Sequence, residues 1–178
     1  KQMEFSIRSG SPAKARTGCV VVGVHEGRKL TPAAAELDKA SGGFLTEILR
    51  RGDHAGRRGT SLLLQDVRKV AAERLLLVGL GKASEFAEGP YRAAVIASMR
   101  ALKSAGTAEA TLYLTDLPVK GRDIGWKAEQ AALAAAEAAY RFDRTKSKPA
   151  AKTHLKKLVL HAEGREDVDA STKALARA

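Results

Sequence analysis

Short apolar runs alternate with longer amphipathic stretches along most of the chain. The apolar runs have the length of β-strands, and most are continuous and rich in valine or leucine, which is typical of strands covered on both faces. The predicted strands are residues 5–7, 19–24, 61–64, 75–78, 111–114 and 155–160. Their alternation with helices predicts a three-layer α/β sandwich, in which helices cover both faces of a mostly parallel or mixed sheet of about six strands.

Three amphipathic stretches are predicted to form the helices of this fold. The first follows Thr31-Pro32, because a threonine N-cap before a proline is a common helix start; it is interrupted at Gly42-Gly43 and resumes as FLTEILRR. The second lies within residues 84–104, where apolar side chains recur at helical spacing. The third follows Asp123 as its N-cap, extends to Phe142, and is rich enough in alanine to lie close to its neighbours.

The sequence changes in character near Phe142. Residues 141–157, RFDRTKSKPAAKTHLKK, are strongly basic and predict an exposed connector before the last strand. The final stretch, VDASTKALARA, predicts the opening turns of another helix with Ser171 or Thr172 as its N-cap. A helix that begins there has little to pack against, so we expect the chain to be a piece of a longer protein.

The composition describes a globular chain with an unusual charge. A length of 178 residues fits one domain, and contents of 44% hydrophobic and 29% charged residues exclude a disordered chain. The 31 lysines and arginines exceed the 20 aspartates and glutamates, which gives a formal net charge of +11. This balance favours an anionic partner, such as nucleic acid or a membrane surface, although a solvated basic surface explains it equally.

Several classes of protein are excluded by what the sequence lacks. No apolar segment is long enough to span a bilayer, and the opening MEFSIRSG is unlike a signal peptide, so we expect a cytoplasmic protein without a membrane partner. Cys19 is the only cysteine, and its place in CVVVGV predicts a buried, unreactive thiol. The histidines show no HExxH spacing and the serines no GxSxG elbow, so we predict neither a metal site nor a catalytic residue.

The stretch RLLLVGLGK is a candidate anion-binding loop. A Walker loop requires a hydroxyl residue after Gly-Lys, where the chain has Ala83, and an earlier glycine, where it has Leu76. A dinucleotide-binding GxGxxG pattern requires glycine in place of Ser84. Backbone amides here could still bind an anion, whereas a tight turn that needs glycine conformations explains the same residues. The candidate anion loop consists of Gly79, Gly81, Lys82 and Ser84.

Two arginine pairs flank a glycine-rich bend in RRGDHAGRRG. Arg50 and Arg51 end a predicted helix, where the helix dipole already favours cations. Arg57 and Arg58 lie in a predicted loop, from which guanidinium groups reach phosphates. Aromatic interleaving and a helix-turn-helix pattern are both missing, so binding to duplex DNA would use phosphate contacts and fall steeply with salt. The predicted DNA-binding residues are Arg57, Arg58, Arg51, Lys146, Lys148, Lys152 and Lys156.

Four segments together resemble the N-terminal domain of bacterial leucyl aminopeptidases, members of the cytosol aminopeptidase family. They are MEFSIRSGSPAKARTGCVVVGVHEGRKLTPAAAELD, FLTEILRRGDHAGRRGTSLLL, ERLLLVGLGK and LTDLPVKGRDIGWKAEQAALAAAEAAYRFD. The resemblance covers residues 3–178. It implies a macro-domain-like fold over residues 3–162 and the start of an interdomain connector helix over 163–178, with the catalytic C-terminal domain absent.

The resemblance also implies a role for the whole protein. The family's enzymes are hexamers that remove N-terminal residues from peptides with two divalent metal ions, manganese or zinc. Their metal ligands and catalytic residues lie in C-terminal motifs of the NTDAEGR kind, which do not occur in this sequence. The resemblance therefore implies a non-catalytic domain without a cofactor of its own, which contacts its catalytic domain and sister subunits and, as in some bacterial members, binds DNA and regulates transcription.

Two other interpretations stay open. One is a small-ligand module that binds an ADP-ribose-like or nucleotide anion at residues 79–84, although the GDIT-like opening of macro domains is missing here. The other is a purely structural domain whose charge keeps it soluble.

Overall fold

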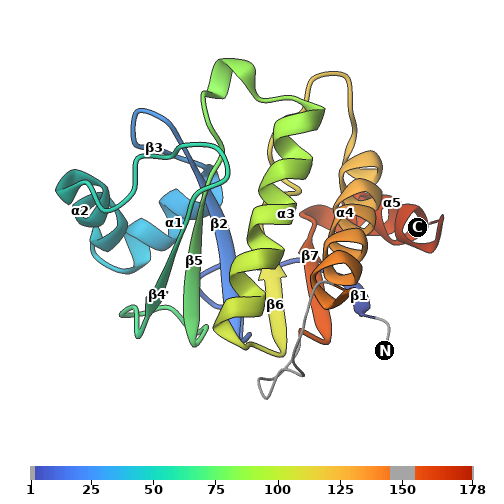
Figure 1. Cartoon of the computed structure of the whole chain (residues 1–178), viewed down its shortest axis with the longest axis horizontal. Helices are drawn as coiled ribbons and strands as arrows, with labels where there is room; N and C mark the ends of the chain where they lie inside the picture. The colour runs from blue at the N-terminus through green and yellow to red at the C-terminus, as the bar shows by residue number, and fades with distance from the viewer. Residues whose placement is uncertain (1–2, 145–154, 178) are drawn as a thin grey trace.

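The structure of the chain is a computed structural model that describes residues 3–144 and 155–177. The strands of this part are β1 Glu4–Arg8, β2 Cys19–His25, β3 Lys29–Leu30, β4 Ser61–Gln65, β5 Arg74–Gly79, β6 Glu109–Leu112 and β7 Lys157–His161. They form one sheet in the spatial order β1-β7-β6-β2-β5-β4, with β3 beside β2 (Figure 1). Neighbours from β1 to β5 are parallel, whereas β4 and β3 pair antiparallel with β5 and β2.

Helices cover both faces of this sheet. They are α1 Pro32–Ala40, α2 Phe44–Arg51, α3 Glu88–Ala105, α4 Ile124–Arg144 and α5 Gly164–Arg177, with a 3-10 turn, η1, at Ala83–Glu85. One hydrophobic core joins Tyr91 of α3 and Ala131 of α4 to the sheet, and a second joins Leu37 of α1 and Leu45 of α2 to the opposite face. The layers can be followed in Figure 1. The predicted three-layer α/β sandwich is confirmed.

The continuous apolar run of β2 shows why the strands were recognisable. Cys19 and Val21 face the core under α3 and α4, while Val20 and Val22 face the core under α1 and α2. All four side chains are fully buried, because successive residues of a strand point to opposite faces and both faces are covered. Each of the predicted strands has an observed counterpart. The sheet gains β3, whose two residues are too few to leave a hydrophobic pattern.

The helix boundaries follow the local signals in the sequence. The Thr31 hydroxyl accepts a hydrogen bond from the Ala34 amide at the start of α1, and the Asp123 carboxylate accepts one from the Trp126 amide at the start of α4. Between α1 and α2 the chain takes left-handed conformations at Gly42 and Gly43, with φ of 73° and 88°. That conformation is costly for residues with a side chain, so the glycine pair separates the two helices as predicted.

The last helix differs from its prediction. α5 begins at Gly164, so Ser171 and Thr172 lie inside it and neither is its N-cap. Its 14 residues pack against α4 and β1, and the Arg177 guanidinium pairs with Glu129 of α4 at 3.3 Å. The expectation that this helix lacks a packing partner is therefore wrong. The helix begins earlier than a cap at Ser171 implies, with Glu166 and Asp167 in its first turn. Its role as an interdomain connector stays a prediction.

A very close packing contact occurs at the carboxyl end of β5. A Cβ atom on Gly79 would lie 1.9 Å from the carbonyl oxygen of Arg57 and 2.5 Å from the Thr60 hydroxyl. The Gly79 amide donates to the carbonyl of Thr60 at 2.8 Å, and the Gly81 amide donates to that of Gly56 at 2.9 Å. The segment before β4 therefore occupies the space that a side chain at position 79 would need.

Replacing Gly79 by alanine should destabilise the chain by about 3 kcal/mol, since backbone atoms would have to move to admit one methyl group. Gly89→Ala is the matched control: it lies in α3, and its added Cβ would meet only the Arg58 side chain, at 3.9 Å. We expect that control to change stability by less than about 1 kcal/mol. Urea unfolding of both variants measures the difference, and equal stabilities would contradict the contact.

The single thiol is expected to resist modification in the folded chain. Cys19 has no exposed surface, and burial raises the pKa of its thiol to about 12, with a smaller opposing effect from Arg74. Because the thiolate is the reactive species, an aromatic disulfide reagent at pH 8 should react only as fast as the chain opens. Addition of guanidinium chloride should make the reaction rapid. Immediate stoichiometric reaction of the folded chain would show that Cys19 is not enclosed.

Candidate nucleic-acid interface

Three loops meet where β2 and β5 end. They are the turn at residues 26–28, the arginine loop at residues 54–60, and the glycine turn at residues 79–82. The Glu26 amide donates to the Gly81 carbonyl at 3.0 Å, and the Gly81 amide donates to that of Gly56 at 2.9 Å. The His25 ring contacts the same Gly81 carbonyl through Nδ1, at 3.1 Å. The fold therefore joins the two candidate anion-binding stretches of the sequence, 50–59 and 79–84, into one surface.

His54 fixes the shape of the arginine loop. Its Nδ1 accepts a hydrogen bond from the Gly56 amide at 2.9 Å, and its Nε2 lies 3.2 Å from the Thr60 hydroxyl. That hydroxyl donates its own hydrogen to the Arg57 carbonyl at 2.6 Å. It therefore accepts a hydrogen bond from the protonated Nε2 of His54, which is a neutral imidazole because its Nδ1 is also an acceptor. Burial lowers the pKa of His54, which favours this neutral form. The loop therefore has a defined conformation, although most of its residues are exposed.

Arg57 and Arg58 extend from this fixed loop into solvent. Both are exposed, and neither guanidinium has a carboxylate or hydrogen-bond partner within residues 3–144 and 155–177. Arg58 lies over the glycine turn: its Cβ is 3.3 Å from the place of a Cβ on Gly81, and its Nη2 is 3.9 Å from that on Gly89. Two unpaired guanidinium groups on a defined backbone are well suited to phosphate oxygens.

Two more exposed cations belong to the same surface. Lys82 lies in the glycine turn, and Arg28 lies in the turn that joins β2 to β3. The sequence analysis missed Arg28, because the short hairpin that presents it left no signal. Glu26 lies in one of these loops and Glu85 follows in η1, so the four cations exceed the two anions. We call this surface the basic edge. It consists of Arg28, Arg57, Arg58 and Lys82.

The other predicted DNA-binding residues do not join the basic edge. Arg51 is paired with Glu47 within α2 at 3.5 Å, in the same helix turn as Arg50. Lys156 is exposed but precedes β7, and because β7 runs in the same direction as β5, it lies at the opposite end of the sheet. Lys146, Lys148 and Lys152 lie outside the described residues.

The geometry of the glycine turn favours a structural explanation for its glycines. The amides of Gly79, Leu80 and Gly81 donate to carbonyl groups of Thr60, Val24 and Gly56, so they are not available to an anion. Gly81 has a φ of 76°, a conformation that favours glycine. Lys82 and Ser84 are exposed beside it, but the helical turn that follows has only three residues. Anion binding at residues 79–84 stays a prediction. Fewer backbone amides are free to bind an anion there than the glycine-rich sequence suggests.

A second polar cluster lies at the carboxyl ends of β6 and β7. His161 contacts Asp116 Oδ2 through Nδ1 at 2.6 Å, and its ring stacks on Tyr113 with centroids 4.4 Å apart. The Nε2 atom of His161 is buried and has no hydrogen-bond partner in the part of the chain that the structure describes. Nearby, Lys127 Nζ donates to the Leu117 carbonyl at 3.0 Å, and burial lowers the pKa of this lysine. No sequence pattern indicated this cluster, because its histidine and aspartate are far apart in the chain.

The family resemblance implied metal ions for the whole protein, and the described residues offer no place for them. Within residues 3–144 and 155–177 no group of three or more His, Cys, Asp or Glu side chains is arranged to hold a metal ion. The Asp116–His161 pair alone supplies too few ligands for the divalent site expected of a metallopeptidase. In the same part of the chain, no helix is both long enough and apolar enough to cross a membrane.

Comparisons with known proteins agree with this architecture. A probable cytosol aminopeptidase of Dechloromonas aromatica (strain RCB) is 46% identical over 176 residues, which cover 98% of this chain and 35% of that protein. A mutant of tomato leucine aminopeptidase superposes with a TM-score of 0.67 at 20% identity, over 97% of this chain and 35% of that one. A Trypanosoma brucei macrodomain in complex with ADP superposes with a TM-score of 0.69 at 10% identity, over 97% and 69%.

The structural similarities at these low identities establish a macrodomain-like fold, and the family follows from the sequence. Residues 21–149 match the model described as cytosol aminopeptidase family, N-terminal domain. The chain spans about a third of the length of the curated relative it matches. It therefore belongs to the cytosol aminopeptidase family and corresponds to the N-terminal domain of its members.

Proposed function

We propose that this chain is the non-catalytic N-terminal domain of a cytoplasmic, metal-dependent leucyl aminopeptidase, and that its basic edge binds the phosphate backbone of duplex DNA. The chain covers 35% of the length of the Dechloromonas aromatica relative, and the family model that it matches is that of the N-terminal domain. Peptide hydrolysis with two manganese or zinc ions would belong to the remaining part. The domain would contribute to the architecture of a hexamer through contacts with its own catalytic domain and with sister subunits.

The DNA-binding part of this proposal rests on Arg57 and Arg58, which extend from a fixed loop and have no partner among the described residues. An exposed guanidinium without a carboxylate neighbour keeps all its donors for phosphate, and a defined backbone reduces the entropy lost on binding. Arg28 and Lys82 extend the positive surface beside this pair. Phosphate contacts of this kind carry little sequence information, so affinity depends mainly on salt concentration and on how many copies act together. Such binding would allow the protein to regulate transcription.

A small-ligand function receives less support. The amides at 79–81 that would surround a nucleotide phosphate already have backbone partners. The likeness to a macrodomain bound to ADP extends to the fold, and a shared fold does not carry a ligand site with it. A purely structural domain is the outcome expected if neither duplex nor nucleotide binds.

Replacing Arg57 and Arg58 together by alanine should weaken binding to a short duplex regardless of its sequence. Loss of two phosphate contacts should also flatten the dependence of log K on log salt by about 2, since each contact contributes about 0.9. Fluorescence anisotropy at several salt concentrations measures both effects. The control is Arg50→Ala with Arg51→Ala, which removes the same charge from a helix end where Glu47 already pairs both arginines.

The control should retain most of the affinity and the salt slope of the unmodified chain. Equal losses in the two double variants would contradict a specific role for the arginine loop and indicate attraction by net charge alone. Saturable binding of a mononucleotide, with no binding of the duplex at low salt, would favour the small-ligand function instead.

Peptidase activity is expected only when the rest of the polypeptide is present. The 178-residue chain should not hydrolyse a leucyl amide substrate with added manganese or zinc, because its described residues form no metal-holding group. A chain extended to the length of its relatives should hydrolyse the substrate and lose activity with a chelator. Metal-dependent turnover by the 178-residue chain would contradict the assignment of this domain as non-catalytic.

A further inference from the structure

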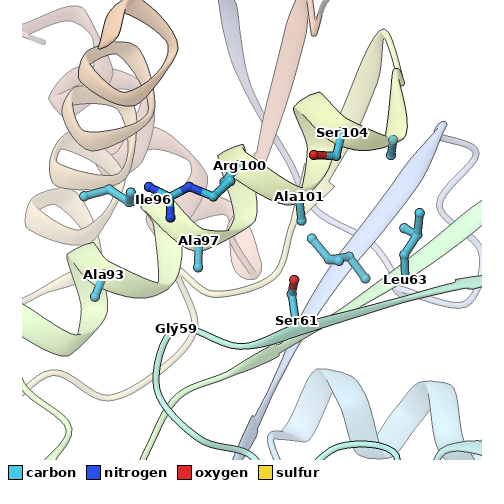
Figure 2. A pocket seen from close by; sticks show the side chains of 11 residues that line it. Gly59, Ser61, Leu63, Ala93, Ile96, Ala97, Arg100, Ala101 and Ser104 are labelled. Carbon is cyan, nitrogen blue, oxygen red and sulfur yellow. The ribbon is translucent and has the colours of Figure 1, made fainter. Parts of the chain in front are cut away.

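An apolar groove runs between the edge strand β4 and helix α3, with a volume of about 580 Å³. Figure 2 shows Ala97 and Ala101 of α3 on one side of it and Ser61 and Leu63 of β4 on the other. Leu76 of β5 also lines the groove. Leu63 packs against the core beneath α3 but is only half-buried, because the groove leaves part of this face of β4 uncovered.

The backbone beside the groove is open to another strand. β4 ends the strand order of the described sheet, so only β5 pairs with it. The Gly79 amide donates to the Thr60 carbonyl, so residues 60 and 79 form a hydrogen-bonded pair. In an antiparallel ladder hydrogen-bonded pairs alternate with pairs that are not hydrogen-bonded. The backbone groups of Leu62 and Leu64 therefore also point toward β5. The N–H and C=O groups of Ser61, Leu63 and Gln65 therefore point away from the sheet. The same residues place their side chains on the groove side.

This edge lacks the features that normally prevent strand addition. Its sequence, SLLLQ, contains no proline, lysine or other charged residue, and the strand is not bulged in its pairing with β5. Exposed hydrophobic edges of this kind are usually blocked by such residues or covered by a partner. An added strand would form main-chain hydrogen bonds to Ser61, Leu63 and Gln65, and every second side chain would enter the groove.

The charges around the groove determine which partner fits. Arg100 is the only charged side chain among its lining residues, and its guanidinium lies over the Phe142 ring at 5.3 Å. Arg74 lies at one end, where its guanidinium donates to the carbonyl of Ala105, and Arg57 and Arg58 precede the lining residue Gly59 at the other. Asp66 is the nearest carboxylate along the strand, one residue after β4. The surroundings are therefore positive at the middle of the groove and at its Gly59 end, whereas Asp66 and Glu73 accompany Arg74 at the other end.

We propose that β4 and this groove bind an extended acidic segment of a partner polypeptide, which adds a strand to the sheet edge. Its apolar side chains alternate with carboxylates, so that the former fill the groove while the latter approach Arg100 and, at the Gly59 end, Arg57 and Arg58. A second copy of the chain is a poorer occupant, since each copy carries a formal charge of +11. The proposed DNA contact requires neither the groove nor the free strand edge, but Arg57 and Arg58 lie at one end of the groove and would contribute to both.

A peptide of alternating valine and glutamate is the direct probe, with an alternating valine–lysine peptide and a block-ordered valine–glutamate peptide as controls. The alternating acidic peptide should bind the chain about tenfold more tightly than either control in fluorescence anisotropy, a difference of about 1.4 kcal/mol. Amide hydrogen exchange should slow at Ser61, Leu63 and Gln65 in its presence. Equal binding of the three peptides, or unchanged exchange at these amides, would overturn the proposal.

Two pairs of variants separate the strand edge from the groove. Ser61→Pro removes one outward N–H at the first residue of the strand, where proline is tolerated, and should lower the affinity for the acidic peptide about fivefold. Ser61→Thr keeps the N–H and should leave this affinity unchanged. Ala101→Glu should weaken the same peptide and Ala101→Lys should strengthen it, with the native fold of each verified by its unfolding transition. Indifference of binding to the charge at position 101 would overturn the proposal. Dimerisation of the free chain with protection of the same amides would also overturn it, and would assign the edge to a second copy.

Discussion

The conformation of the arginine loop depends on the missing side chain at position 79. The carbonyl oxygen of Arg57 lies 1.9 Å from the place that a Cβ atom would take, so only a glycine lets the loop approach the end of β5 closely enough to exchange backbone hydrogen bonds with it. Neutral His54 then closes the loop from within by joining Gly56 to Thr60. Because these contacts satisfy the loop's backbone, its arginine side chains are left free for other partners. The glycines that suggested a phosphate-binding loop thus act indirectly, by supporting the residues that face solvent.

The same arrangement separates the surfaces of the domain. Exposed cations gather at the carboxyl ends of β2 and β5, whereas the lateral edge at β4 is apolar in its middle and has Arg57 and Arg58 at one end. At the far side of the sheet, α5 packs on α4 and β1. The proposed duplex and the proposed extended polypeptide would therefore share Arg57 and Arg58 but otherwise contact different parts of the fold. The positive charge of the chain is therefore unevenly distributed over its surface, which the net charge alone does not show.

Much of the fold was predictable from local sequence, because its strands are buried on both faces and its helix starts carry recognisable caps. The run CVVVGV and the cap at Thr31 depend only on neighbouring residues, and both predictions are confirmed. The start of α5 was misplaced because a cap at Ser171 fits the sequence as well as the observed start at Gly164; packing against α4 decides between them. β3 was missed because two residues cannot show an alternating pattern.

The candidate sites were predictable only in part. The sequence singled out Arg57 and Arg58 by their loop position, but only the fold shows that they lie beside Gly81 and that Lys156 lies at the opposite sheet end. The pairing of Asp116 with His161 and the groove beside β4 depend on contacts between distant segments, which leave no local pattern. Long-range packing is therefore what the sequence analysis could not supply.

The proposal that the basic edge contacts DNA is tested most directly by mapping amide chemical shifts of the chain during titration with a short DNA duplex at low salt. It predicts that the largest changes cluster at residues 26–28, 54–60 and 79–82. Changes centred on Lys156 and the amino ends of the strands, or spread evenly over the basic surface, would contradict it.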